Sequence, residues 1–124
     1  MPIFLDSHHG AELPVDVIRR FLRSARSGTP DPRGVVPLDL YCGDDGRVFC
    51  IVAAPDEATV RQGHAAEGVV CRRVRPVPSF GSASNELNAE EKAVVRQMIE
   101  AEQETSLWHI TEVGDGDGWL RQVG

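Results

Sequence analysis

The segment VVPLDLYCGDDGRVFCIVA, residues 35–53, decides the fold of this chain. It contains two runs rich in aliphatic residues, about 35–42 and about 47–53, and such runs are typical of β-strands. The GDDG sequence between them is typical of a hairpin turn, with Asp45-Gly46 as the two central residues. The segment therefore predicts a β-hairpin at the centre of the fold.

The predicted turn also fixes which side chains share a face of the hairpin. It places Tyr41 opposite Cys50 and Cys42 opposite Phe49, because the turn determines the register of the two strands. Tyr41 and Cys50 then share a mixed face with Val48. The opposite face is apolar throughout and is expected to lie beneath helices; it carries Leu38, Leu40, Cys42, Phe49, Ile51 and Ala53.

Strand and helix signals alternate around this hairpin. Apolar residues at helical spacing follow Pro14 and Pro55, and proline suits the first position of a helix. The predicted elements are strands at about 3–8 and 69–74 and helices at about 14–26 and 55–66. The order β-α-β-β-α-β predicts an α+β fold of the ferredoxin-like type over about 1–76. Right-handed crossovers would place both helices on one face of the sheet and leave the other face uncovered.

An acidic extension is predicted for the remainder of the chain. We expect a Pro- and Ser-rich linker over 77–88 and a helical extension over 89–124, with a helix and then a short strand. Asn88 and Glu91 have the spacing of a capping box at the start of this helix. Residues 81–124 carry nine acidic and three basic side chains, which accounts for the net charge of −6. The extension is expected to pack on the domain or on a partner subunit.

Composition argues against several classes of protein. The 124 residues suit one domain. An acidic total without a basic stripe argues against binding to nucleic acid or to anionic membranes. No apolar run approaches the roughly 20 residues that cross a bilayer, and no secretory signal is visible. Three cysteines without framework spacing indicate a reducing compartment, so we expect a cytoplasmic protein.

Three stretches of the chain together resemble a known family: FLDSHH, YCGDDGRVFCIVAAPDEATVRQGH and VVCRRV. The shared pattern begins with aspartate-x-histidine at the end of the first strand, here Asp6 and His8. It continues with an aspartate-rich turn before VFC, and with alanine-proline-aspartate before a helix that carries a late histidine, here His64. Over about 1–76 the chain resembles a bacterial domain family of unknown function that includes nickel-binding members. The resemblance implies a ferredoxin-like fold and a nickel site.

Candidate metal ligands converge in the predicted fold. Asp6 and His8 share the uncovered face of the first strand by alternation, and Cys50 of the neighbouring third strand is expected beside them with Tyr41. His9 adds an imidazole at the junction of strand and helix. Imidazole, thiolate and carboxylate groups suit nickel or zinc better than calcium or magnesium. Each residue also has a structural interpretation, such as an exposed strand end for the histidines and a small buried hydrophobe for the cysteine.

His64 is expected far from His8, late in the second helix. It shares a helix face with Val60, which is typical of a core or interface histidine, and joint ligation with His8 would need a second subunit. The uncovered face includes the apolar side chains of Phe4 and Val48, and an exposed apolar patch favours association. We therefore expect a homodimer, whose interface would enclose a ligand pocket lined by Phe4, Tyr41 and Val48 beside the metal ligands.

The leading hypothesis from the sequence is a small, non-catalytic metal-binding protein. It would sequester or sense a metal, nickel in the first place, with zinc or no metal as alternatives. A different hypothesis is a ligand-binding or protein-interaction module of the dimeric α+β-barrel type, whose acidic C-terminal helix could dock a partner. A third is a small enzyme that uses Asp6, His8 or Tyr41 as acid-base groups.

Overall fold

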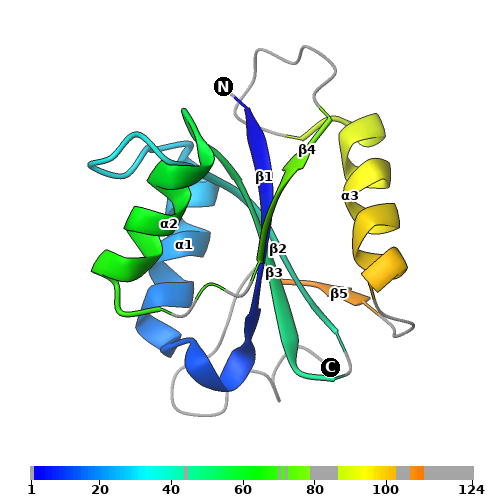
Figure 1. The fold of residues 1–124 in the computed structure, drawn as a ribbon, viewed down its shortest axis with the longest axis horizontal. Coiled ribbons are helices and arrows are strands. Elements are labelled where there is room, and N and C mark those ends of the chain that lie inside the picture. The colour runs from blue at the N-terminus through cyan, green and yellow to red at the C-terminus, as the bar shows by residue number, and fades with distance from the viewer. Residues whose placement is uncertain are drawn as a thin grey trace.

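A five-stranded antiparallel sheet organises the chain (Figure 1). The computed structural model describes residues 2–43, 45–69, 71, 73–78, 87–102 and 107–110. The strands are β1 (Ile3–His9), β2 (Val36–Gly43), β3 (Arg47–Ala53), β4 (Arg73–Val77) and β5 (Leu107–His109). The helices are α1 (Val15–Ser27), α2 (Glu57–Ala66) and α3 (Ala89–Glu102), and a single 3-10 turn, Gly10–Glu12, follows β1. The order β4-β1-β3-β2 is compatible with the predicted ferredoxin-like arrangement, and β5 is added at the β2 edge.

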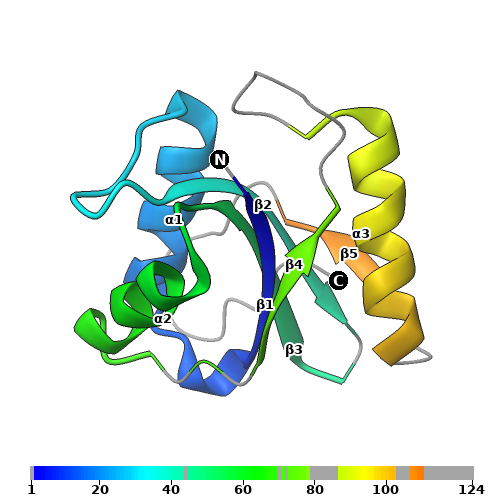
Figure 2. The ribbon, with the colours of Figure 1, turned by 45° about the horizontal axis from the view of Figure 1, so that its top comes forward.

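Helices α1 and α2 begin and end close to the residues that the sequence indicates. α1 ends at Gly28, whose φ of 67° is a left-handed conformation that glycine adopts without strain. The residues that α1 buries are Ile18 and Leu22, one turn apart. α2 begins after Asp56, whose carboxylate accepts a hydrogen bond from the Thr59 N–H at 2.7 Å. Both helices lie on the same face of the sheet (Figure 2).

α3 covers the opposite face of the sheet, so the expectation of an uncovered face is wrong (Figure 1). The side chains of Val95 and Ile99 are fully buried in a cluster that includes the sheet residue Phe49. The predicted capping box is confirmed: the Asn88 N–H donates to Glu91 Oε1 at 3.0 Å, and the Glu91 N–H donates to Asn88 Oδ1 at 2.8 Å. Much of the predicted linker and of the end of the extension falls on 79–86, 103–106 and 111–124, outside the described residues.

The predicted register of the β2-β3 hairpin is wrong by one residue. Cys42 pairs with Val48 and Tyr41 with Phe49, whereas the sequence predicted Cys42 with Phe49. The cause is the turn, in which the Gly46 N–H donates to the Gly43 carbonyl at 3.1 Å and Gly46 takes a φ of 85°. A loop that ends on a left-handed glycine is one residue longer than the predicted two-residue turn. A shift of one residue in the register changes which side chains of the two strands lie on the same face of the sheet.

The corrected register separates side chains that were expected together. Leu40, Cys42, Val48 and Cys50 lie on the face covered by α1, and Phe49 and Ile51 lie on the face covered by α3. Tyr41 is buried on the α3 face, whereas Phe4 and Val48 are buried on the other. The predicted pocket of Phe4, Tyr41 and Val48 is therefore not formed. The apolar patch that favoured a homodimer is not exposed, and homodimerisation stays a prediction without that argument.

Tyr41 is the only tyrosine of the chain and offers a test of its position on the α3 face. Its hydroxyl donates to Asp39 Oδ2 at 3.2 Å, and burial together with this carboxylate raises its pKa to about 12. A spectrophotometric alkaline titration should therefore give a midpoint near 12, because an exposed tyrosine ionises near pH 10. The raised pKa stabilises the fold up to about pH 10, and this contribution is lost as the pH rises towards 12. The variant Asp39→Asn should lower the midpoint, and a wild-type midpoint near 10 with intact circular dichroism would contradict this placement.

Candidate metal centre

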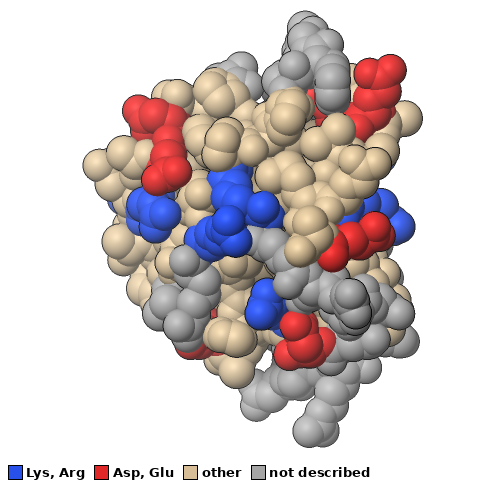
Figure 3. All heavy atoms as spheres, turned by 45° about the vertical axis from the view of Figure 1, so that its right-hand side comes forward, with Lys and Arg blue, Asp and Glu red and all other residues tan. Residues whose placement is uncertain are grey.

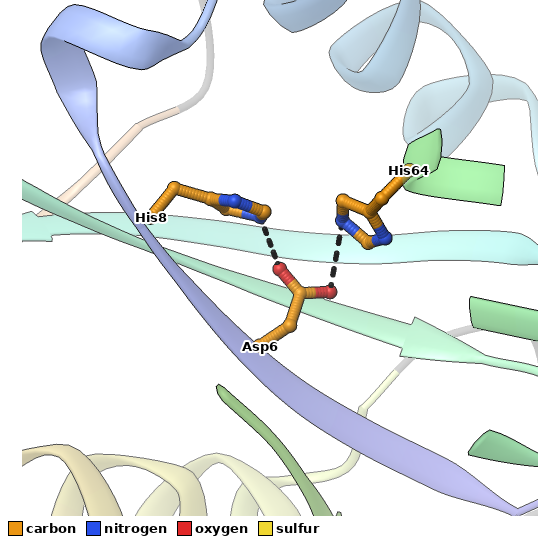
Figure 4. A group of neighbouring side chains, drawn as sticks. All are labelled: Asp6, His8 and His64. Atoms are coloured by element: carbon orange, nitrogen blue, oxygen red, sulfur yellow. Dashed lines mark hydrogen bonds and ion pairs between the residues drawn. The ribbon is translucent and has the colours of Figure 1, made fainter. Parts of the chain in front are cut away.

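Asp6, His8 and His64 come together between the sheet and α2 (Figure 4). Asp6 and His8 are two residues apart on β1, so both side chains point to the face that α1 and α2 cover. β1 is a central strand, paired with β3 on one side and β4 on the other. His64 lies in the last turn of α2 and reaches the same place from the helix.

The three side chains are close enough to share one ion. His8 Nε2 donates to Asp6 Oδ1 at 2.5 Å, and His64 Nε2 lies 3.5 Å from Asp6 Oδ2. The centroids of the two imidazole rings are 4.8 Å apart. Each residue offers one ligand atom, and these atoms lie within 4.8 Å of one another. Asp6 is 0% and His8 1% exposed, so the group is shielded from bulk water.

A backbone hydrogen bond sets the orientation of the His64 ring. Its Nδ1 lies 2.6 Å from the carbonyl oxygen of Val60, one helical turn earlier, so Nδ1 carries a proton and donates it. The other nitrogen, Nε2, therefore faces Asp6 either with an added proton or with a lone pair. Histidines that bind metals commonly donate their second ring N–H to a backbone carbonyl in this way. The arrangement leaves Nε2 as the nitrogen available to a cation.

Electrostatics keep the Asp6 carboxylate ionised despite its burial. Burial alone would raise the pKa of Asp6, but the close contact and charge of His64 and the hydrogen bond and charge of His8 outweigh it, and the pKa is lowered. Burial likewise opposes a charge on His64, yet its close contact with the Asp6 carboxylate raises the pKa of that imidazole. Among the described residues, Asp6 Oδ2 has no hydrogen-bond partner. The site is thus a buried anion, and His64 Nε2 approaches its oxygen Oδ2 at 3.5 Å.

This geometry fits a transition-metal ion. Metal bonds of about 2.0–2.2 Å to nitrogen and oxygen place neighbouring ligand atoms roughly 3.0–3.5 Å apart. The 3.5 Å between His64 Nε2 and Asp6 Oδ2 meets this condition, whereas the 2.5 Å contact of His8 is a hydrogen bond that would have to open. Two imidazoles and one carboxylate suit zinc, nickel or copper better than calcium or magnesium. Three protein ligands also leave room for water or another ligand on the ion.

The other predicted ligands do not join the group. Cys50 pairs with Asp6 across β1 and β3, but its sulfur is not among the ligand atoms within 4.8 Å. Burial, and then the charge of Asp6, raise the pKa of the Cys50 thiol well above its usual value. His9 is exposed and, by alternation, points to the opposite face of the sheet. Tyr41 lies on that opposite face as well.

The expectation that His8 and His64 could meet only through a second subunit is wrong. They meet within one chain because Asp6 and His8 lie on the face that α2 covers, not on a bare face. The sequence signal that could have found this was the histidine late in α2 together with an aspartate in a central strand. A buried carboxylate needs a compensating partner, and the nearest covering helix supplies it.

Comparison with protein-family models, with curated proteins and with solved structures found no match to this chain. The resemblance to a family of unknown function that includes nickel-binding members therefore remains an expectation from the sequence. In the part of the chain that the structure describes, no helix has the length and apolar character to cross a membrane.

The pKa shifts at this site predict how the stability of metal-free protein changes with pH. Because the pKa of His64 is raised above 6.5, its ion pair stabilises the fold below pH 6.5 and is lost as the pH rises through the folded pKa. Because the pKa of Asp6 is lowered below 3.8, the contribution of its carboxylate to the stability of the fold is lost only as the pH falls through this lowered folded pKa. The free energy of unfolding, measured with urea in the presence of a chelator, should therefore fall as the pH rises above 6.5 and through the folded pKa of His64.

A matched control distinguishes the effect of His64 on this pH dependence from that of another histidine, His9. His64→Gln should remove most of this fall in the free energy of unfolding, and His9→Gln should leave it unchanged. An equal fall in the wild type and in His64→Gln would show that the His64–Asp6 pair does not cause it.

Proposed function

We propose that this protein binds one divalent transition-metal ion through Asp6, His8 and His64, and that nickel is its preferred ion. The observation that carries the proposal is the buried, ionised Asp6 carboxylate between two imidazoles, with an oxygen that lacks a hydrogen-bond partner among the described residues. The Val60 carbonyl supports it, because it holds His64 with Nε2 towards the carboxylate.

The choice of nickel rests on the donor set and on the sequence pattern. Nitrogen and carboxylate donors suit nickel and zinc alike, so the donor set alone gives a class of ions. The aspartate-x-histidine and the late histidine of the family that the sequence resembles, which includes nickel-binding members, correspond to these three residues, and this favours nickel. Burial of Asp6 and His8 supports a role in sequestering or sensing the ion without catalysis, because a buried ion exchanges slowly with solvent ligands. All three ligands come from one chain, so the proposal does not need a dimer.

Calorimetric titration of metal-stripped, untagged protein tests the proposal. Nickel should bind with one ion per chain, and His64→Ala and His8→Ala should each weaken binding by at least about tenfold, because each removes a donor nitrogen. Binding should also weaken as the pH falls, because protons compete for the imidazoles. Magnesium, which requires oxygen ligands, should not compete.

His9→Ala is the matched control, since it removes an imidazole one residue from His8 that points to the other face of the sheet. It should bind nickel like the wild type. Equal nickel uptake by His64→Ala and wild type would contradict the proposal, and tighter binding of zinc than of nickel would contradict the choice of ion.

A second candidate function, the binding of a small organic molecule, is favoured by a cavity beside the triad. This cavity of about 420 Å³ lies between α1, α2 and the sheet, and its walls include apolar side chains such as Val17, Phe21 and Val52. A cavity of this size and character is typical of sites for small ligands. It would serve such a ligand with or without a metal.

Octanoate is a suitable probe for this cavity. Binding to metal-stripped protein should be abolished by Val17→Trp, which fills the space, and preserved in Val17→Leu. If octanoate does not bind, or binds equally to both variants, this second function is wrong and the metal proposal is unaffected.

A further inference from the structure

A second cavity lies on the α3 face of the sheet. It has a volume of about 530 Å³, and it is lined by Ser7, His8, His9, Arg47, Arg73, Arg75 and Ala101. Ser7 stands between Asp6 and His8 on β1, and alternation turns its side chain to the opposite face. The register places Ser7 opposite Arg73 and His9 opposite Arg47. Three adjacent strands thus contribute side chains to one wall.

The charge of this wall contrasts with the charge of the chain. The protein has a net charge of −6, yet three guanidinium groups line one cavity. Figure 3 shows Lys and Arg side chains gathered in the middle of this side of the molecule, with acidic side chains placed around them. Like charges on neighbouring strands repel one another. A group of arginines around a cavity is therefore a site that favours an anion.

Neighbouring groups hold Arg75 and Arg47 in position. Arg75 donates to the carbonyl oxygen of Met98 in α3 at 3.3 Å, and Arg47 pairs with Asp45 at 3.4 Å. A guanidinium group has five N–H donors, so it can keep such a neighbour and hold an oxyanion at the same time. Arginine also matches phosphate geometry with two parallel hydrogen bonds, which lysine cannot do.

The spacing of the arginines indicates a ligand larger than a single ion. Arg73 and Arg75 are two residues apart on one strand, about 7 Å, and Arg47 lies two strands away, about 10 Å across the sheet. The cavity volume falls within the range of sites for small molecules. Both features fit a small molecule that carries phosphate groups.

We propose that the cavity lined by Ser7, Arg47, Arg73 and Arg75 binds a phosphate-bearing small molecule. The arginines supply paired donors to the phosphate oxygens, and the Ser7 hydroxyl, at the centre of the wall, supplies a further donor. The proposal does not rest on the metal proposal, because the side chains of Ser7 and the three arginines point to the other face of the sheet. His8 is the one metal-site residue that also lines the cavity.

Calorimetric titration of metal-stripped protein with inorganic phosphate and inorganic pyrophosphate, at fixed ionic strength, tests this site. Pyrophosphate should bind saturably at one site per chain and more tightly than phosphate, because it reaches more of the arginines. Arg73→Gln and Arg47→Gln should each weaken pyrophosphate binding by about tenfold or more, since each removes a charged donor pair. Arg73→Lys keeps the positive charge but not the paired donors, so it should bind pyrophosphate more tightly than Arg73→Gln and less tightly than the wild type.

Arg61→Gln is the matched control for the loss of one positive charge. Arg61 lies on α2, where it pairs with Glu57 at 3.1 Å, on the opposite face of the sheet. This variant, and the metal-site variant His64→Ala, should bind pyrophosphate like the wild type. The proposal is wrong if the wild type shows no saturable binding, if acetate binds as tightly as pyrophosphate, or if Arg61→Gln weakens binding as much as Arg73→Gln. Unchanged melting temperatures confirm that each variant is folded.

Discussion

A carboxylate in the middle of a central strand is the constraint on which the site and the placement of α2 depend. Asp6 is fully buried on β1, and removing an ionised group from water costs several kcal/mol unless partners replace the water. His8 compensates it from the same strand and His64 from the helix above. The fold that buries this charge must therefore keep α2 over β1.

α2 depends on this polar contact more than an ordinary amphipathic helix does. The residue that it buries fully is Val60, so its apolar contact with the sheet is narrow. Arg20 of α1 also holds the end of α2 through two contacts to Glu67, at 3.1 and 2.8 Å. Both side chains are about half exposed, so this pair contributes only about 0–1 kcal/mol. The buried Asp6–His64 contact is thus the interaction that fixes α2, and an ion bound there would reinforce it.

The sequence contained enough information for the order of the elements but not for the faces of the sheet. Proline, glycine and capping residues mark both ends of α1 and the start of α3 because their effects are local. The hairpin register is different, because GDDG accommodates both a two-residue turn and a longer turn that ends on Gly46. The pattern of apolar and polar side chains could not choose between the two turns, because both faces of β3 are apolar. Val48 and Val52 lie on the face that α1 and α2 cover, and Phe49 and Ile51 lie on the face that α3 covers. A strand buried on both sides does not show which side is inward.

The same alternation explains why the candidate site was only half predictable and why β1 has two different surfaces. Asp6 and His8 could be placed together from their spacing alone, whereas His64 required knowledge of which face α2 covers. Ser7 and His9 point the other way, towards the arginines of β3 and β4.

Three arginines on the metal side would repel a divalent cation, since two like unit charges 10 Å apart cost about 1.7 kcal/mol at an effective dielectric constant of 20. Placing the carboxylate and imidazoles on one face and the guanidinium groups on the other separates the proposed cation site from the proposed anion site by the thickness of one sheet. A slip of one residue in β1 would turn Asp6 and His8 towards the face of the arginines and away from His64, so the pairing of β1 with β3 and β4 decides which set each side chain of β1 meets.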